Sequence, residues 1–190
     1  MNEKYETNEL KISFLKSYFC HNGLLTCNTN QDLPSLESIG GDWNSIVALI
    51  ERGEVFYSKL YKGRVSYLSR DFYYQIKPYK QRINKLSVKS KEILDFVKAV
   101  ELAETHEIKN VFMLSAKDFT KFMDELLKEL FVTAVQRSIT MNANWCSFRW
   151  GTYDRWEQLS ERPEDKPDKS TVYKLLSGIM TNNQIYNLLK

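Results

Sequence analysis

The chain has 190 residues, of which 43% are hydrophobic and 27% charged, and it contains only seven Gly and four Pro. This balance is typical of a globular protein that buries a sizeable core, and it excludes a low-complexity or collagen-like chain. The formal net charge is +3, which is too small to indicate a partner unless the charges are unevenly distributed along the chain.

The cysteines and the N-terminal segment bear on metals and location. Cys20, Cys27 and Cys146 are odd in number and form no CxxC pair, and His21 and His106 lie far apart in the sequence, so no zinc pattern emerges. We therefore expect free thiols in a reducing cytoplasm, and neither a metal nor a cofactor. The N-terminus is polar, unlike a signal peptide. No window approaches the ~20 apolar residues of a membrane span, so no membrane contact is expected.

The first 86 residues predict helices followed by one hairpin. Apolar residues recur at helical spacing, Asp42 and Ser69 are suited to cap helices, and Lys62-Gly63 is suited to the hairpin turn. We expect helices at residues 8–18, 34–39, 43–52 and 70–76, a short strand at 24–27, a hairpin at 54–69 and a basic connector at 79–86.

The stretch from Ser115 to Thr152 limits the fold most, because a helical period gives way to a strand period, a polar break and a second strand. This order suggests the core of a winged helix. Around it we expect helices at 87–104, 105–112, 115–130 and 153–159, strands at 131–139 and 145–152, a turn at 140–144, and later helices at 171–180 and from 182 onward.

Both halves show helices, then a hairpin, then a short helix. We therefore predict a mostly helical α+β fold of tandem winged-helix-like modules, each with a small antiparallel hairpin, plus C-terminal helices. The predicted domains are an N-terminal module at 1–86, a C-terminal winged helix at 87–160, and a linker with C-terminal helices at 161–190. The last helices are amphipathic, so they offer a surface through which two copies could pair as a homodimer.

Charge is concentrated between Glu54 and Leu86, where eight cations stand against two acidic residues and six tyrosines are interleaved. Cations neutralise phosphate and aromatic faces stack on bases, so this span predicts binding to DNA or another nucleic acid. The equally weighted alternative is that the tyrosines are half-buried and that the cations protect a hairpin edge. The candidate binding residues here are Lys59, Lys62, Arg64, Arg70, Lys77, Lys80, Arg82, Tyr61 and Tyr67.

The predicted helix at 115–130 carries two further candidates, Lys117 and Lys121, in its first turns. Its acidic residues make it net negative, which favours a solvated scaffold over a helix that reads a DNA groove. After it comes an aromatic cluster, for which core packing is favoured over base stacking. The acidic residues are Asp118, Asp124, Glu125 and Glu129, and the aromatic cluster comprises Trp145, Phe148, Trp150, Tyr153 and Trp156.

Several strings resemble the AlkZ-related proteins, bacterial winged-helix relatives of the AlkZ-type DNA glycosylases. They are Leu33-Pro34-Ser35-Leu36, VFYSKLYKGRVSYLSRDFYYQI, SVKSKEILDFV, LSAKDFTKFMDELLKEL and WCSFRWGTYDRWEQL, which together extend from about Leu24 to Leu159. The resemblance implies tandem winged-helix modules and DNA as partner.

Glycosylases of the AlkZ type use a Gln-x-Gln or Gln-x-Asp motif. This chain contains neither spacing, and the nearest approach, Gln31-Asp32, is adjacent. No P-loop, GxSxG, GxGxxG or HExxH motif occurs either. We therefore assign no catalytic residue and favour a non-enzymatic binding protein. A glycosylase-like base-excision enzyme and a non-catalytic protein-interaction module are the alternatives.

Overall fold

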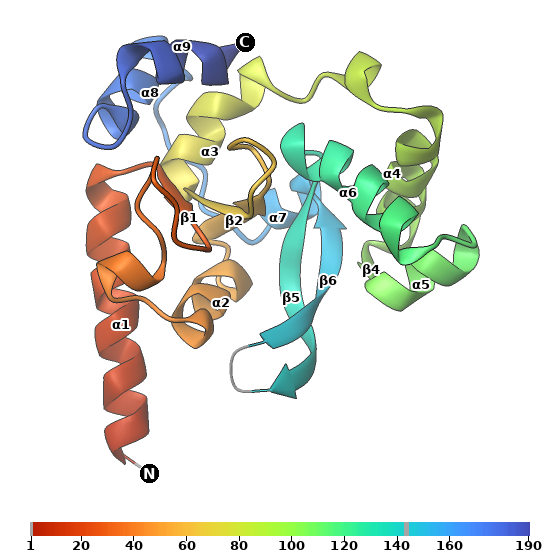
Figure 1. Cartoon of the computed structure of the whole chain (residues 1–190), viewed down its shortest axis with the longest axis horizontal. Helices are drawn as coiled ribbons and strands as arrows, with labels where there is room; N and C mark the ends of the chain where they lie inside the picture. Colours follow the sequence, from red (N-terminus) through yellow and green to blue (C-terminus); the bar gives the residue numbers. More distant parts are fainter. Residues whose placement is uncertain (1, 143–144) are drawn as a thin grey trace.

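The computed structural model describes the backbone of residues 2–142 and 145–190, and the side chains of residues 8–139 and 146–190. Residues 143 and 144 of the predicted turn, and the side chain of Trp145, lie outside these described residues. Helices outweigh strands, and the strands form two three-stranded antiparallel sheets (Figure 1). The predicted mostly helical α+β class is confirmed.

The first sheet belongs to the N-terminal half. Its strands are β1 (Leu24–Thr26), β2 (Val55–Ser58) and β3 (Ser66–Ser69), in the order β1-β3-β2. The helices around it are α1 (Asn2–His21), the 3-10 helix η1 (Glu37–Ile39), α2 (Trp43–Glu51) and α3 (Arg70–Ile76). Asp42 and Ser69 cap α2 and α3 as predicted. The predicted start of the first helix at residue 8 is wrong, because α1 begins at Asn2.

The second half repeats this topology with longer strands. Two 3-10 turns, η2 (Lys77–Tyr79) and η3 (Ile83–Lys85), connect it to the first half. Its helices are α4 (Val88–Val100), α5 (Thr105–Val111), α6 (Ala116–Lys128) and α7 (Tyr153–Glu157). Its strands are β4 (Leu102–Glu104), β5 (Val132–Asn142) and β6 (Trp145–Thr152), in the order β4-β6-β5. In each half a short early strand therefore pairs with the last strand of the hairpin.

One predicted helix in this half was too long. Residues 87–104 were expected to be a single helix, but α4 ends at Val100 and Glu101 adopts a φ of 63°. This left-handed backbone turns the chain, so that the next three residues pair with β6 as strand β4. The strand is too short to show an alternating pattern in the sequence.

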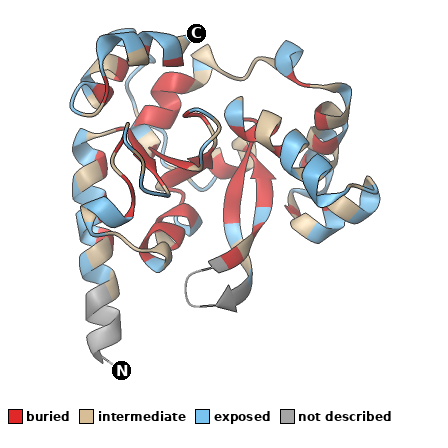
Figure 2. Cartoon of the chain, in the orientation of Figure 1, coloured by how far each residue is buried: buried red, intermediate tan, exposed pale blue. Residues whose placement is uncertain are grey.

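Both faces of the first sheet are buried, because successive side chains of a strand point to opposite faces. Val55 and Tyr57 of β2 enter one hydrophobic core, and Phe56 between them enters a second core. In β3, Tyr67 and Leu68 divide in the same way. Figure 2 shows these strands and most of α3 as buried. The sheet is thus a central layer covered from both sides.

The hydrophobic cores cross the predicted boundary at residue 86. The first core joins residues of α1 and α2 to residues of α4, α6, β5 and β6. Thr133 of β5 is buried and its Oγ1 accepts a hydrogen bond from the Tyr57 backbone N–H at 3.0 Å and donates one to the Tyr57 carbonyl at 2.9 Å. Trp156 of α7 is fully buried in the second core, against the first sheet.

The C-terminal helices α8 (Lys169–Leu176) and α9 (Asn182–Leu189) complete the second core beside α3. Their apolar side chains Val172, Leu176, Ile185 and Leu188 are buried within this chain. A homodimer through these helices stays a prediction, and it would have to use their remaining surface. Among the described residues, no helix has the length and apolar character needed to cross a bilayer.

Candidate nucleic-acid interface

Three lysines of α6 lie on one exposed stripe. Lys117, Lys121 and Lys128 are separated by four and seven residues, spacings that return to the same side of a helix with 3.6 residues per turn. All three side chains are exposed. Within the described part of the chain none of them forms an ion pair, so each ammonium group is available to a phosphate.

Each acidic side chain of α6 is held by another group of the protein. Asp124 pairs with Lys59 at 2.6 Å, Glu129 with Arg82 at 3.0 Å, and Asp118 accepts a hydrogen bond from Ser115 Oγ at 2.6 Å. Glu125 accepts hydrogen bonds from the Ser87 backbone N–H and from Ser90 Oγ.

Burial would raise the pKa of Glu125, but the hydrogen bonds from Ser87 and Ser90 outweigh it and hold the pKa below its ordinary value. This carboxylate is therefore ionised at neutral pH and committed to anchoring the start of α4. The negative charge of α6, which favoured a scaffold role from sequence, leaves out Lys59 and Arg82, which neutralise Asp124 and Glu129. Asp118 and Glu125 keep their negative charge.

The hairpin of the first half meets the C-terminal end of this stripe. Besides the Lys59–Asp124 pair, a Cβ placed on Gly63 would lie 3.2 Å from Lys128 Cε, so the β2–β3 turn and Lys128 are in contact. Figure 1 shows the loop after β2 beside that end of α6. The turn adds the exposed cations Lys62 and Arg64. We call the set Lys62, Arg64, Lys117, Lys121 and Lys128 the α6 track.

Lys62 also pairs with Asp32 at 2.7 Å, and its side chain remains 56% exposed. An exposed pair of this kind contributes at most about 1 kcal/mol, so Lys62 can exchange its carboxylate partner for a phosphate. The hydrogen bond that Lys62 donates, together with its positive charge, holds the pKa of Asp32 below its ordinary value.

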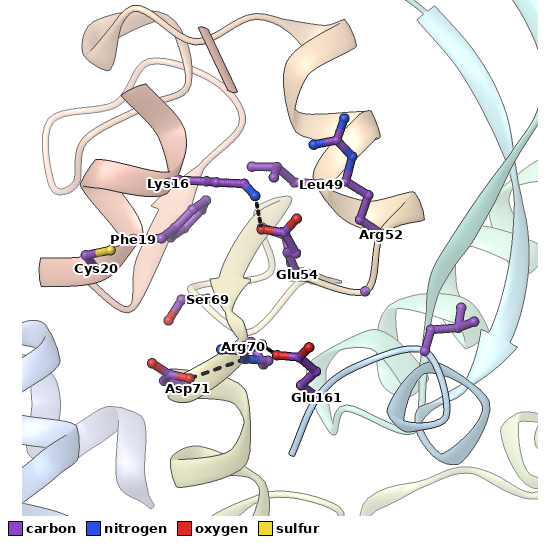
Figure 3. Close-up of a pocket in the computed structure, with 13 residues that line it drawn as sticks. Lys16, Phe19, Cys20, Leu49, Arg52, Glu54, Ser69, Arg70, Asp71 and Glu161 are labelled. Atoms are coloured by element: carbon purple, nitrogen blue, oxygen red, sulfur yellow. Dashed lines mark hydrogen bonds and ion pairs between the residues drawn. The ribbon is translucent and has the colours of Figure 1, made fainter. Parts of the chain in front are cut away.

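Two of the predicted binding cations, Arg70 and Lys77, lie outside the α6 track and pair with carboxylates. Arg70 lines a cavity of about 460 Å³ between α1, α2 and the start of α3, where it pairs with Glu161 at 3.1 Å and Asp71 at 3.5 Å (Figure 3). Lys16 and Glu54 pair across the same cavity at 2.8 Å. Lys77 is paired with Glu157 at 2.5 Å. The 460 Å³ cavity is lined by three cations and three carboxylates, which offer an anion no net attraction; they are Lys16, Arg52, Arg70, Glu54, Asp71 and Glu161.

The basic connector lies against the end of α6. Arg82 donates hydrogen bonds to the Glu129 carboxylate from Nε at 3.0 Å and from Nη2 at 3.1 Å. The Gln81 backbone N–H donates to the Glu129 carbonyl at 3.0 Å. Lys80 is half-buried, and desolvation together with the charge of Arg82 lowers the pKa of Lys80 to about 8, against the opposing effect of Glu129. The connector therefore joins the end of the α6 track without adding its full formal charge.

The burial of Tyr61 and Tyr67 corrects the prediction that these tyrosines bind nucleic acid. Tyr61 is 4% and Tyr67 0% exposed, so neither ring has a face on which a base could stack. They are buried because both faces of the hairpin are covered, whereas stacking on bases requires an exposed ring face. Phe148, Trp150 and Trp156 are also buried in the cores, which confirms the prediction that they pack rather than stack.

Sequence reasoning missed two residues of interest. Lys128 is absent from the predicted binding residues, although its spacing from Lys117 and Lys121 gives the signal. Glu157 gave no signal, because its partners Tyr73 and Lys77 lie about eighty positions away in sequence. Among the described residues, no group of three His, Cys, Asp or Glu side chains could hold a metal ion.

Comparison with known proteins identifies a family. A family model described as AlkZ related matches residues 25–186. No match was found among curated proteins or among solved structures. The match extends from β1 into α9 and thus includes both sheets, the whole α6 track and most of the C-terminal helices. The chain belongs to the AlkZ-related family.

Proposed function

We propose that this protein binds DNA or another nucleic acid in the cytoplasm through the α6 track, with its two halves acting as tandem winged-helix-like modules. In this assignment α6 is the helix that approaches the groove, and the β2–β3 turn of the other module contacts the backbone. The observation that carries the proposal is the exposed stripe of Lys117, Lys121 and Lys128, which continues into Lys62 and Arg64 while every carboxylate on α6 has a partner.

The repeated topology supports the module assignment. Each half places a helix, a short strand, further helices and a hairpin in the same order, and the sheet orders β1-β3-β2 and β4-β6-β5 are equivalent. Membership of the AlkZ-related family, whose name points to a relative associated with DNA repair, favours DNA among the nucleic acids.

Five cations neutralise few phosphates, so binding should be weak and strongly dependent on salt. The affinity of a B-DNA complex falls with a slope of about −0.9 per phosphate contact on logarithmic axes. We expect micromolar affinity at about 50 mM salt and much weaker binding above about 200 mM salt.

The test is a fluorescence anisotropy titration of a short duplex and of its single strand with wild type, Lys121→Glu and Lys98→Glu. Lys121 belongs to the α6 track, while Lys98 is an exposed lysine of α4 that does not belong to it. Lys121→Glu should weaken binding about tenfold at low salt, because it removes one phosphate contact and adds a repulsive charge. Equal losses in the two variants, or no binding by wild type at low salt, would reject the proposal.

A glycosylase-like enzyme remains the second candidate, and one observation favours it. A cavity of about 390 Å³ between α3, α7 and residues 162–167 is lined by the carboxylate of Glu157 and the amide of Gln81, the group types that could position water beside an extruded base. Release of free base from alkylated DNA by wild type, and its loss in Glu157→Gln, would support this activity. Wild type that binds such DNA without releasing base would exclude it under those conditions.

A further inference from the structure

The cavity near the connector contains a lysine with unusual surroundings. Lys80 lines the 390 Å³ cavity together with Lys77, Gln81, Glu157 and Arg162. Its side chain is half-buried, and within the described residues its ammonium forms neither an ion pair nor a hydrogen bond. Glu129, the carboxylate that could have paired with Lys80, accepts hydrogen bonds from Nε and Nη2 of Arg82.

The surroundings favour the uncharged amine. Desolvation and the positive charge of Arg82 lower the pKa of Lys80 to about 8, whereas an exposed lysine has a pKa of about 10.4. The neutral fraction at pH 8 is therefore roughly a hundredfold larger than for an ordinary lysine. A desolvated lysine beside another cation is a recognised arrangement for an amine that attacks carbonyl groups.

The same cavity holds groups that suit the rest of such a reaction. Glu157 accepts hydrogen bonds from Tyr73 at 2.7 Å and from Lys77 at 2.5 Å, both on Oε1, which fixes its carboxylate at the cavity wall. Arg162 is an exposed cation at the rim and forms no ion pair within the described residues. A carboxylate can move protons, and Arg162 can bind a phosphate beside the carbonyl group, although a second carboxylate, Asp165, also lines the cavity.

We propose that Lys80 is a nucleophilic amine that captures an aldehyde lying next to a phosphate, such as the opened sugar of an abasic site in DNA. This inference rests on the proposed nucleic-acid binding for its preferred source of the aldehyde. Gln81 and Arg82, which follow Lys80, contact Glu129, the neighbour of the track residue Lys128. A strand bound on the track therefore ends near this cavity.

The reaction balances without an oxidant or reductant. The lone pair of Lys80 Nζ attacks the aldehyde carbon, and the carbonyl electron pair moves to oxygen. Two protons leave nitrogen for that oxygen, with Glu157 as the carboxylate able to transfer them, and the oxygen departs as water. The product is a C=N imine between Lys80 and the substrate. Added borohydride delivers hydride to the imine carbon and makes the link permanent.

The experiment mixes the full-length protein with an oligonucleotide containing one abasic site in the presence of cyanoborohydride, and separates crosslinked protein on a denaturing gel. Lys80→Arg keeps the positive charge but removes the nucleophile, because a guanidinium stays protonated. Lys85→Arg is the matched exposed control, and Lys77→Arg tests the other lysine of the cavity. Peptide mass spectrometry of the wild-type adduct identifies the modified residue whether or not the variants fold.

We expect a wild-type adduct on the peptide containing Lys80, a loss of about tenfold or more in Lys80→Arg, and no loss in the other two variants. An adduct that persists in Lys80→Arg, or that maps to another lysine, would overturn the proposal. Wild type that binds abasic DNA without forming an adduct would overturn it and leave the proposed nucleic-acid binding intact.

A second arm replaces DNA with glyceraldehyde 3-phosphate. If wild type fails to bind DNA, the proposed function fails, but reductive labelling of Lys80 by this small phosphorylated aldehyde would still support the nucleophile and point to a free sugar phosphate as the source. Absence of labelling in both arms would overturn the inference about Lys80 itself.

Discussion

At the scale of single residues, Trp156 of the second half packs in a core formed with the first sheet. It comes from α7, yet its ring packs edge-on against Phe56 at 5.1 Å and Tyr73 at 4.8 Å between ring centroids. Its Nε1 donates a hydrogen bond to the Val55 carbonyl at 3.2 Å. The side chain is completely buried, so its truncation would open a large cavity under the first sheet.

We predict that Trp156→Ala lowers the free energy of unfolding by about 3–5 kcal/mol. Phe14→Ala, which truncates a ring that is 52% exposed on α1, should cost less than about 1 kcal/mol. Urea denaturation followed by circular dichroism measures both values. A cost below about 1 kcal/mol for Trp156→Ala would show that α7 does not support the first sheet.

Lys80 makes a prediction about pH. The unfolded chain has a lysine pKa of about 10.4, and the folded pKa is lowered to about 8. Between these values the unfolded state holds the proton and the folded state does not, so stability rises with pH across this window. Below pH 8 the folded state bears the cost of a desolvated charge.

Lys80→Met should therefore be more stable than wild type at pH 7, and this advantage should disappear by about pH 10. Lys98→Met, at an exposed position of α4, should show no such trend. Urea denaturation at pH 7, 8, 9 and 10, values chosen to bracket the window of about 8 to 10.4, measures the difference. An advantage that stays constant or grows with pH would contradict the desolvated lysine.

Residues such as Tyr67 show where prediction from sequence stops. The hairpin was predicted with the correct turn and strands, because Lys62-Gly63 and the flanking residues are local signals. Its burial could not be predicted, since the layers that cover it come from α1, α2 and the C-terminal helices, which are distant in sequence. Whether the tyrosines can stack on bases or are packed in the core depends on these distant segments, which the local sequence does not show.

At the scale of elements, α6 shows why a net charge misleads. The position and length of this helix were predicted from the sequence to within about two residues, and Ser115 caps it. The partners of its carboxylates were not readable, because Lys59 and Arg82 belong to the other half of the chain. Charge segregation on this helix is a property of tertiary structure.

Removing the carboxylate of the Lys59–Asp124 pair should strengthen nucleic-acid binding, whereas the lysine substitutions should weaken it. Asp124→Asn removes a negative charge between Lys121 and Lys128 and frees Lys59. We expect nucleic-acid affinity to increase about two- to fivefold at low salt, a gain of up to ~1 kcal/mol. Anisotropy titration measures it, with Asp95→Asn on the exposed face of α4 as control. A decrease in affinity would place the bound strand away from α6.

The predicted element boundaries were likewise accurate where the signal is local and wrong where it depends on distant residues. Helices with strong caps, such as α2 and α3, were predicted to within a residue or two, whereas β4 was absorbed into the preceding helix. Its strand identity comes from pairing with β6, about fifty residues later. Three residues carry too little pattern to compete with the helical signal of α4.

At the scale of the whole molecule, shared cores predict one cooperative unit. Leu68 lies in the central strand of the first sheet and Trp150 in the central strand of the second. Because the first core spans both halves and the second brings α7 to the first sheet, both amides should exchange only through global unfolding. Native-state hydrogen exchange should therefore give equal protection free energies at the two sites. A difference above about 2 kcal/mol would indicate separately folding modules.

The central claim is that nucleic acid binds along the α6 track. The most direct test measures how affinity for a DNA duplex depends on salt for wild type, for the triple variant Lys117→Gln, Lys121→Gln, Lys128→Gln, and for a control triple at Lys98, Lys166 and Lys174, which are exposed elsewhere. The track variant should lower the magnitude of the logarithmic salt slope by roughly 2–3, about 0.9 per lost phosphate contact. The control should keep the wild-type slope. An unchanged slope in the track variant, or equal changes in both triples, would contradict the claim.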